Sequence, residues 1–99
     1  MIRHVSLLTW ADHATTADID AVRVAVAALP SQIPEIRAYS FASDLGAAAG
    51  NAHFAIVADF DDLDAWDRYQ RHPAHQALLT DRVRPILAAR AAVQLEFGP

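Results

Sequence analysis

The sequence contains no cysteine, no lysine and only three glycines among its 99 residues. Without cysteine, the chain cannot form a disulfide, supply a thiol nucleophile or hold an iron–sulfur cluster. Without lysine, it cannot form a Schiff base or build a phosphate-binding P-loop. Gly46, Gly50 and Gly98 are too few and too widely spaced for a dinucleotide-binding fingerprint. We therefore expect the protein to work without a cofactor.

Positive charge is also scarce. The chain has eight arginines against twelve acidic residues, a net charge of −4, and the arginines are scattered. Nucleic acids and anionic membranes select for clustered positive charge, so we expect neither as a partner. The apolar run at the N-terminus is too short and too interrupted for a signal peptide, and no later stretch is long enough to span a membrane. A cytoplasmic location is therefore expected.

The first part of the chain predicts two strands around one helix. Residues 2–10 are rich in β-prone side chains and are followed by turn-forming residues. Residues 16–29 predict a helix, because a threonine can cap it and apolar side chains recur on one face. Pro30 and Pro34 mark the exit of this helix, and residues 35–42 alternate like a second strand.

The rest of the chain continues with the same kinds of signal. Periodicity, acidic capping residues and prolines separate its segments. We expect four elements in order: a third strand over 53–60, a helix carrying Leu63, Trp66 and Tyr69, a longer helix from Pro73 through Leu87 with a kink at Pro85, and a last strand over 92–97.

The predicted order is β-α-β-β-α-β, which is typical of the ferredoxin-like α+β fold with a four-stranded antiparallel sheet and both helices on one face. The first and third strands carry apolar side chains on both faces. An antiparallel sheet whose second face met water would be polar there. We therefore expect the uncovered face to pack against a second copy of the chain, as a homodimer.

One segment gathers groups that can transfer protons. Tyr69-Gln-Arg-His72-Pro73-Ala-His75 places a phenol and two imidazoles around a proline. Proline disfavours helical backbone in the preceding residue and often opens a helix, so His75 is expected in a helix's first turn. The positive end of a helix disfavours imidazolium, which favours a neutral His75 that can accept a proton near pH 7. The alternative interpretation is a helix break flanked by solvated histidines.

With these features, the chain resembles the dimeric α/β-barrel proteins of the stress-responsive A/B barrel (Dabb) family. The resemblance extends over residues 1–99 and implies a single Dabb domain whose protomers pair sheet to sheet into a barrel. The matching features are Ile2-Arg3-His4 in the first strand, Ile33-Pro34 before the second, Phe60 at the end of the third, and the Tyr69-x-x-His72-Pro73-x-His75 segment nine residues later.

One branch of the family is similar to plant polyketide cyclases such as olivetolic acid cyclase, which close a polyketide ring by intramolecular aldol condensation. Resemblance to this branch implies His75 as the base, Tyr69 as its phenol partner and His4 as a third catalytic residue. A neutral His75 would remove a proton α to a carbonyl while the Tyr69 hydroxyl donates to the enolate oxygen. His53 falls one residue out of register with that branch and receives no role.

Four further residues are expected to contact a polyketide-like or other small apolar ligand, namely Ser6, Leu8, Trp66 and His72. Structural roles remain open for several of these positions. Trp66 and Tyr69, at helical spacing, are also typical of the core face of a helix. His4 can equally be a hydrogen-bonded core histidine, and His72 can simply face solvent.

Other classes of function are also compatible with these residues. The protein can be a non-catalytic, stress-responsive protein that binds a small apolar ligand, or a cofactor-free monooxygenase or isomerase. A metal site built from His72 and His75 with His4 or Asp59 is a further alternative. We expect no metal, because Pro73 separates the two imidazoles by a bend and no third ligand is close in sequence.

Overall fold

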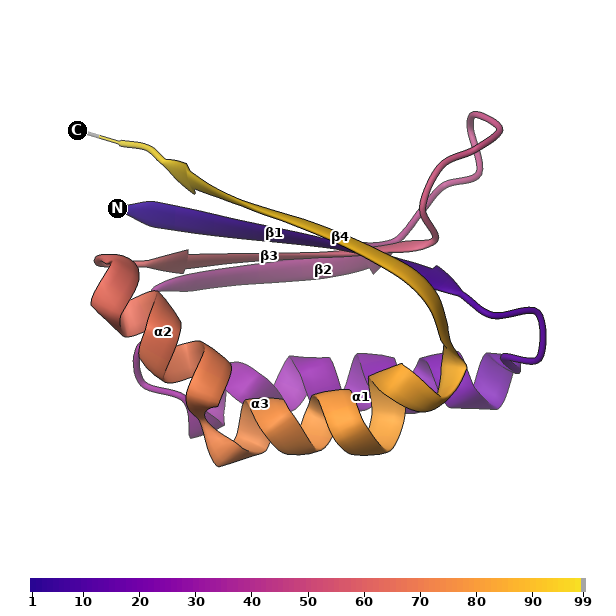
Figure 1. Ribbon diagram of the computed structural model, residues 1–99, viewed down its shortest axis with the longest axis horizontal. Coiled ribbons are helices and arrows are strands. Elements are labelled where there is room, and N and C mark those ends of the chain that lie inside the picture. Colours follow the sequence, from indigo (N-terminus) through magenta and orange to yellow (C-terminus); the bar gives the residue numbers. More distant parts are fainter. Residues whose placement is uncertain (99) are drawn as a thin grey trace.

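The computed structural model describes residues 1–98 and contains one four-stranded antiparallel sheet in the order β2-β3-β1-β4. All helices lie on one side of this sheet, and the other side is bare (Figure 1). The elements in chain order are β1 (Ile2–Trp10), α1 (Thr16–Gln32), β2 (Ala38–Ser43), β3 (Phe54–Phe60), α2 (Leu63–Arg71), α3 (Pro73–Leu78), a π-helical turn η1 (Leu79–Val83), a 3₁₀ turn η2 (Arg84–Ile86) and β4 (Leu87–Glu96). The predicted β-α-β-β-α-β order and ferredoxin-like arrangement are confirmed.

The core lies between the sheet and the helices. Alternate residues of β1 are buried from His4 onward, as the period of two along a strand requires. Their neighbours on β3, the inner faces of α1 and α2, and residues of α3, η1 and η2 complete the core. Its largest fully buried side chains are Phe54, Phe60, Leu29, Ile33, Val22, Val26 and Val83.

Side-chain caps fix where the helices begin. Thr15 and Asp18 form a capping box at the start of α1, each side chain bonding to the other residue's backbone N–H. The Asp62 side chain accepts from Ala65 N–H and starts α2. The helix α1 extends to Gln32, so the prediction that it ends at residue 29 was wrong. Pro30 is tolerated because it lies in the last turn, where few hydrogen bonds remain to be lost.

The prediction of a long helix through Leu87 was also wrong. The helix α3 ends at Leu78 and gives way to the wider turn η1 and the tighter turn η2, which contains Pro85. Leu87 is the first residue of β4, so this strand is ten residues long and not the six expected. A proline without an N–H therefore ends the helical segment here instead of kinking it. The strand β1 has the predicted bounds, whereas β2 and β3 start later than predicted, at Ala38 and Phe54.

The bare side of the sheet, called the open face below, is apolar except for one ion pair and two small hydroxyl side chains. Arg3 Nε and Nη2 donate to the two carboxylate oxygens of Asp59 over 2.8 and 3.0 Å. By the strand registers, the open face consists of Arg3, Val5, Leu7 and Thr9 of β1, Ala38, Ser40 and Ala42 of β2, Ala55, Val57 and Asp59 of β3, and Ala89, Ala91, Val93 and Leu95 of β4.

No helix within residues 1–98 has the length and apolar character that crossing a membrane requires.

Candidate functional site

The predicted site residues meet where α2, α3 and η1 face β1 and β4. A hollow of about 390 Å³ opens there, lined among others by His75, Leu79, Val83 and Arg90. The same four residues also line a more enclosed cavity of about 20 Å³, deeper between the helices and the sheet. Five of the residues predicted from the sequence line this smaller cavity: His4, Ser6, Leu8, Tyr69 and His75.

His75 lies in the first turn of α3 and is 7% exposed. Its Nδ1 lies 3.1 Å from the carbonyl oxygen of Gln70. Because a carbonyl oxygen can only accept, Nδ1 carries the proton and Nε2 keeps a free lone pair. Burial lowers the pKa of His75, and the positive charge of Arg90 lowers it further. The hydrogen bond to the Gln70 carbonyl raises this pKa, but by less than burial lowers it. The neutral ring expected from the sequence therefore has burial as its largest cause.

His4 lies on β1 directly across from Gln94 of β4 and is 2% exposed. The Gln94 amide nitrogen donates to His4 Nδ1 over 2.9 Å, so the neutral His4 ring carries its proton on Nε2. Burial lowers the pKa of His4 most, and the positive charge of Arg90 lowers it further, to about 4. Both histidines of the cavity are thus neutral near pH 7, one with a free acceptor nitrogen and one with a free N–H.

Tyr69 is almost fully buried on α2, with its ring centroid 4.4 Å from that of His75 and 6.2 Å from that of His4. Burial raises the pKa of the Tyr69 hydroxyl, which therefore stays protonated and can donate a hydrogen bond. Burial also raises the pKa of Tyr39, and the nearby Tyr69 hydroxyl raises it further. No hydrogen bond of good geometry joins the two hydroxyl groups. Within residues 1–98, Tyr39 Oη and Trp66 Nε1 are buried without a hydrogen-bond partner.

Two of the predicted ligand contacts line neither cavity. The Trp66 ring lies 6.1 Å from the His4 ring. His72 is at the bend, where its Nδ1 accepts from Ala74 N–H over 3.0 Å and caps α3. This bond gives His72 a structural role at the junction of the two helices, and a ligand contact by either residue stays a prediction.

The remaining histidines lie away from the cavity. His53 Nδ1 accepts from the backbone N–H of Trp10, and its own backbone N–H donates to Leu8, so it connects the start of β3 to the end of β1. His13 is exposed and its Nε2 donates to the carbonyl oxygen of Pro85 over 2.9 Å. Neither bond brings an imidazole toward His75.

Sequence analysis did not single out Arg90 and Gln94, both on β4. Arg90 pairs with Leu8 and Gln94 with His4 across the β1–β4 ladder, so both share the helix-covered face with His4. The alternation of Gln94 with Val93 and Leu95 was visible in the sequence. In a ferredoxin-like sheet the last strand lies beside the first, which would have placed Gln94 next to His4. Arg90 was missed because the strand was expected to begin only at residue 92.

The residues considered for a metal site are not gathered. Within residues 1–98, no group of three or more histidine or carboxylate side chains is arranged to hold a metal ion. Asp59 is on the open face, bound to Arg3, and His72 uses Nδ1 as a cap.

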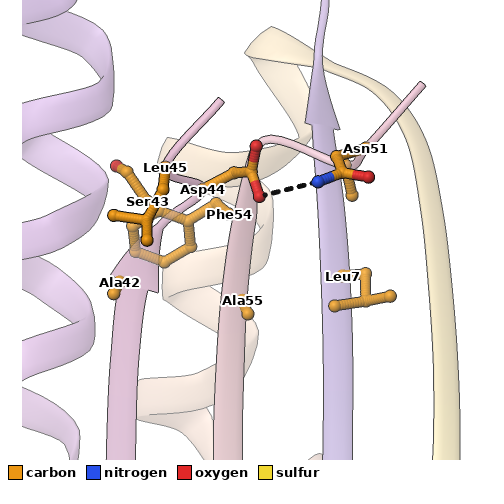
Figure 2. Close-up of a pocket in the computed structure, with 9 residues that line it drawn as sticks. Leu7, Ala42, Ser43, Asp44, Leu45, Asn51, Phe54 and Ala55 are labelled. Carbon is orange, nitrogen blue, oxygen red and sulfur yellow. Dashed lines mark hydrogen bonds between the residues drawn. The ribbon is translucent and has the colours of Figure 1, made fainter. Parts of the chain in front are cut away.

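A second hollow of about 390 Å³ lies beside the β2–β3 connection (Figure 2). Leu7, Ala42 and Ala55 border it from the open face, and Leu45 in the connection is 95% exposed. An Asn51–Asp44 hydrogen bond of 3.2 Å ties the two ends of the connection together. Asp44 is the one titratable side chain lining this hollow, so it lacks the paired donors and acceptors found around His75.

The fold and the cavity define a ferredoxin-like α+β protein with a histidine–tyrosine pocket on the helix-covered face. The family model of the Stress responsive A/B Barrel Domain (Dabb) matches residues 2–97, and the chain belongs to this family. A dimeric ferredoxin-like protein of unknown function from Thermobifida fusca is 46% identical, with a TM-score of 0.90 over 97% of this chain and 90% of that one.

More distant structures share the fold. A hydroxynitrile lyase from Passiflora edulis is 16% identical, with a TM-score of 0.84 over 99% of this chain and 96% of that one. A structure described as an antibiotic biosynthesis monooxygenase is 18% identical, with a TM-score of 0.74 over the full length of both chains. A search of curated proteins gave no match. At these identities the two enzymes establish the fold and not the reaction.

Proposed function

We propose that the protein is a cofactor-independent enzyme that uses His75 and Tyr69 for acid–base chemistry on a carbonyl compound, and that its reaction is the aldol-type ring closure of a polyketide-like chain. The observation that supports this most directly is the contact between the two rings, whose centroids are 4.4 Å apart, with Nε2 of His75 left free to accept a proton. A neutral base beside a protonated phenol is the pair that enolisation requires.

In this reaction, His75 Nε2 takes a proton from the carbon α to a carbonyl group. The Tyr69 hydroxyl and the His4 Nε2–H stabilise the negative charge that grows on the enolate oxygen by hydrogen bonding. The enolate carbon then attacks a second carbonyl of the same chain and forms the new carbon–carbon bond. The imidazolium of His75 returns its proton to the resulting alkoxide, so that acid and base are regenerated.

The sizes of the two cavities suggest how a substrate would lie. The enclosed cavity of about 20 Å³ has room for a single water molecule. The adjoining hollow of about 390 Å³ falls within the range of small-molecule sites. The body of the substrate would therefore occupy the hollow, with the reacting end directed past Leu79 and Val83 toward His75.

The experiment that tests this function follows ring closure of linear β-polyketone substrates by mass spectrometry. His75→Asn, which keeps a donor for the Gln70 carbonyl but removes the base, should lower the rate by about 10² or more. Tyr69→Phe should lower it by about tenfold or more, and His13→Asn, which removes an exposed imidazole, should leave it unchanged. Equal rates in wild type and His75→Asn would contradict the mechanism, and oxygen consumption with an oxidised product would indicate a monooxygenase instead.

A second candidate is a non-catalytic protein that binds a small apolar ligand. The observation in its favour is the second hollow of about 390 Å³, where Leu7, Leu45 and Phe54 are among the lining residues and Asp44 is the one titratable side chain. A concave site with a mostly apolar lining and few polar groups is typical of small-molecule binding. Saturable binding without any product, unchanged in His75→Asn, would favour this candidate.

We also propose that two protomers pair through the open face. The apolar side chains of Val5, Leu7, Val57, Val93 and Leu95 would be covered in this way, and Val93 and Leu95 are 48% and 47% exposed in the single chain. The 46% identical protein from Thermobifida fusca is described as dimeric, which supports the same assembly here.

A further inference from the structure

Arg90 differs from most arginines of this chain because it has no ion pair or side-chain hydrogen bond within residues 1–98. Five of the eight arginines pair with carboxylates, namely Arg3, Arg23, Arg37, Arg68 and Arg71. Arg90 pairs with Leu8 across the β1–β4 ladder and lines both the enclosed cavity and the hollow, together with His75. An unpaired guanidinium thus stands at the point where the hollow leads to the proposed base.

The hollow is locally positive although the chain carries a net charge of −4. Arg71, Arg84 and Arg90 line it with a single carboxylate, Asp67, which is already bound to Arg71 at 2.6 Å. By contrast, a hollow near the N-terminus has no basic side chain and is lined by Asp61, Asp62, Asp64 and Glu96. The distribution of charge therefore singles out the hollow beside His75 as the one that suits an anion.

We propose that Arg90 binds a carboxylate of the ligand, so that the substrates of this site are carbonyl compounds that carry a carboxylate near the carbon deprotonated by His75. A guanidinium binds a carboxylate through two parallel hydrogen bonds, a geometry that fixes orientation as well as position. His4 and His75 are neutral and cannot compete for the anion by charge. The assignment rests on the proposed function only in naming His75 as the reacting group.

A test of this assignment compares two probes of the same shape and different charge. The probes are 1-hydroxy-2-naphthoate and its carboxamide, with Kd measured by calorimetry at pH 7.5 for wild type, Arg90→Gln and Arg82→Gln. Arg82 is an exposed arginine of η1 with no ion pair within the described residues and outside the hollow, so its replacement makes the same change in net charge. We expect Arg90→Gln to raise the Kd of the acid by about tenfold or more, and Arg82→Gln by less than about twofold.

The carboxamide should bind wild type more weakly than the acid and should be insensitive to Arg90→Gln. Arg90→Lys, which keeps the charge but not the fork of donors, should recover only part of the acid's affinity. Equal affinities of wild type for acid and amide, equal losses in Arg90→Gln and Arg82→Gln, or no binding of the acid at millimolar concentration would each overturn the assignment.

The outcome is separable from that of the proposed function. If His75→Asn abolishes ring closure but Arg90→Gln binds the acid normally, the acid–base mechanism stands and the carboxylate assignment fails. If Arg90 governs acid binding but no substrate is converted, the assignment stands for a binding protein and the proposed enzyme fails. His75→Asn should bind the acid within about threefold of wild type in either case, since Arg90 is intact.

Discussion

The helix-covered face of the sheet combines an apolar core with polar side chains, whereas the open face is mainly apolar. Beside Leu8, Phe54 and Phe60, the helix-covered face carries the buried His4 and Ser6 on β1 and the exposed Arg90 and Gln94 on β4. The open face, normally polar, is apolar apart from the Arg3–Asp59 pair and two small hydroxyl side chains.

This contrast separates the two requirements that the chain has to meet. Polar groups are costly to bury, so His4, Ser6 and His75 beneath the helices need a reason beyond packing, and a ligand site bordered by the exposed, unpaired Arg90 supplies one. Apolar groups on an uncovered face need a cover, and a second protomer supplies it. The helix-covered face therefore concerns chemistry and the open face concerns assembly, and substitutions on the two faces should have separable effects.

The largest effect is expected from a charge at the centre of the open face. Val57 of β3 lies between Val5 and Ser40 on that face, so Val57→Asp would bury a carboxylate in each protomer of a dimer. An uncompensated buried charge costs several kcal/mol, which corresponds to an increase of about 10³ or more in the dimer dissociation constant. Analytical ultracentrifugation over a range of concentrations measures this change.

Val24→Asp is the matched control, because Val24 on α1 is 73% exposed and on the helical side of the molecule. It should leave the dimer intact. If Val57→Asp stays dimeric at the same protein concentration as wild type, the open face is not the dimer interface. Its apolar side chains would then need an explanation other than assembly.

A smaller effect is expected from the pH dependence of stability on the helix-covered face. The pKa of His4 falls from its ordinary 6.5 to about 4 in the folded chain, mainly through burial. Below pH 6.5 the unfolded chain therefore binds a proton that the folded chain does not, so stability falls as the pH drops toward 4 and levels off below it. The full difference corresponds to about 3 kcal/mol, and the lowered pKa of His75 acts in the same direction.

Urea unfolding at pH 7.5 and pH 4.0 measures this loss. Carboxylates also titrate in this range, but their contribution to the loss is the same in His4→Phe and cancels when the variant is compared with wild type. The variant should lose about 3 kcal/mol less than wild type between the two pH values, whereas the exposed-site control His13→Phe should match wild type. If His4→Phe shows the wild-type dependence, the imidazole of His4 is not the buried neutral group described above.

Much of the fold could be predicted because its signals are local. The alternation of residues 2–10, the capping residues before α1 and α2 and the proline before α3 each act within a few residues along the chain. The end of the last helical segment depended on tertiary context. The wide turn η1 and the tight turn at Pro85 lead directly into β4, a change of direction that helical periodicity alone does not reveal.

The candidate site could be predicted only where the sequence segment itself carried it. Tyr69 and His75 are six residues apart around one bend, and the cavity brings them together as expected. Arg90 and Gln94 join them through the pairing of the first strand with the last, a contact between residues about 90 positions apart in the case of His4 and Gln94. The contact of Gln94 with His4 follows once the last strand is placed beside the first, whereas Arg90 lay outside the predicted strand, which began at residue 92.

The smallest effect should come from Gln94, which fixes the tautomer of His4 but is itself exposed. Gln94→Ala removes the donor to His4 Nδ1, so the His4 proton should redistribute between the two ring nitrogens while the fold and the dimer persist. Loss of one neutral hydrogen bond should lower the free energy of unfolding by about 1 kcal/mol. The ¹⁵N shifts of the His4 ring report the tautomer directly, without a substrate. The control is Glu96→Ala, on the same face of β4 but opposite Ile2, which should leave those shifts unchanged. An unaltered His4 tautomer in Gln94→Ala would mean that burial alone fixes the proton of the His4 ring. The polar side chains on this face of β4 would then serve only the hollow.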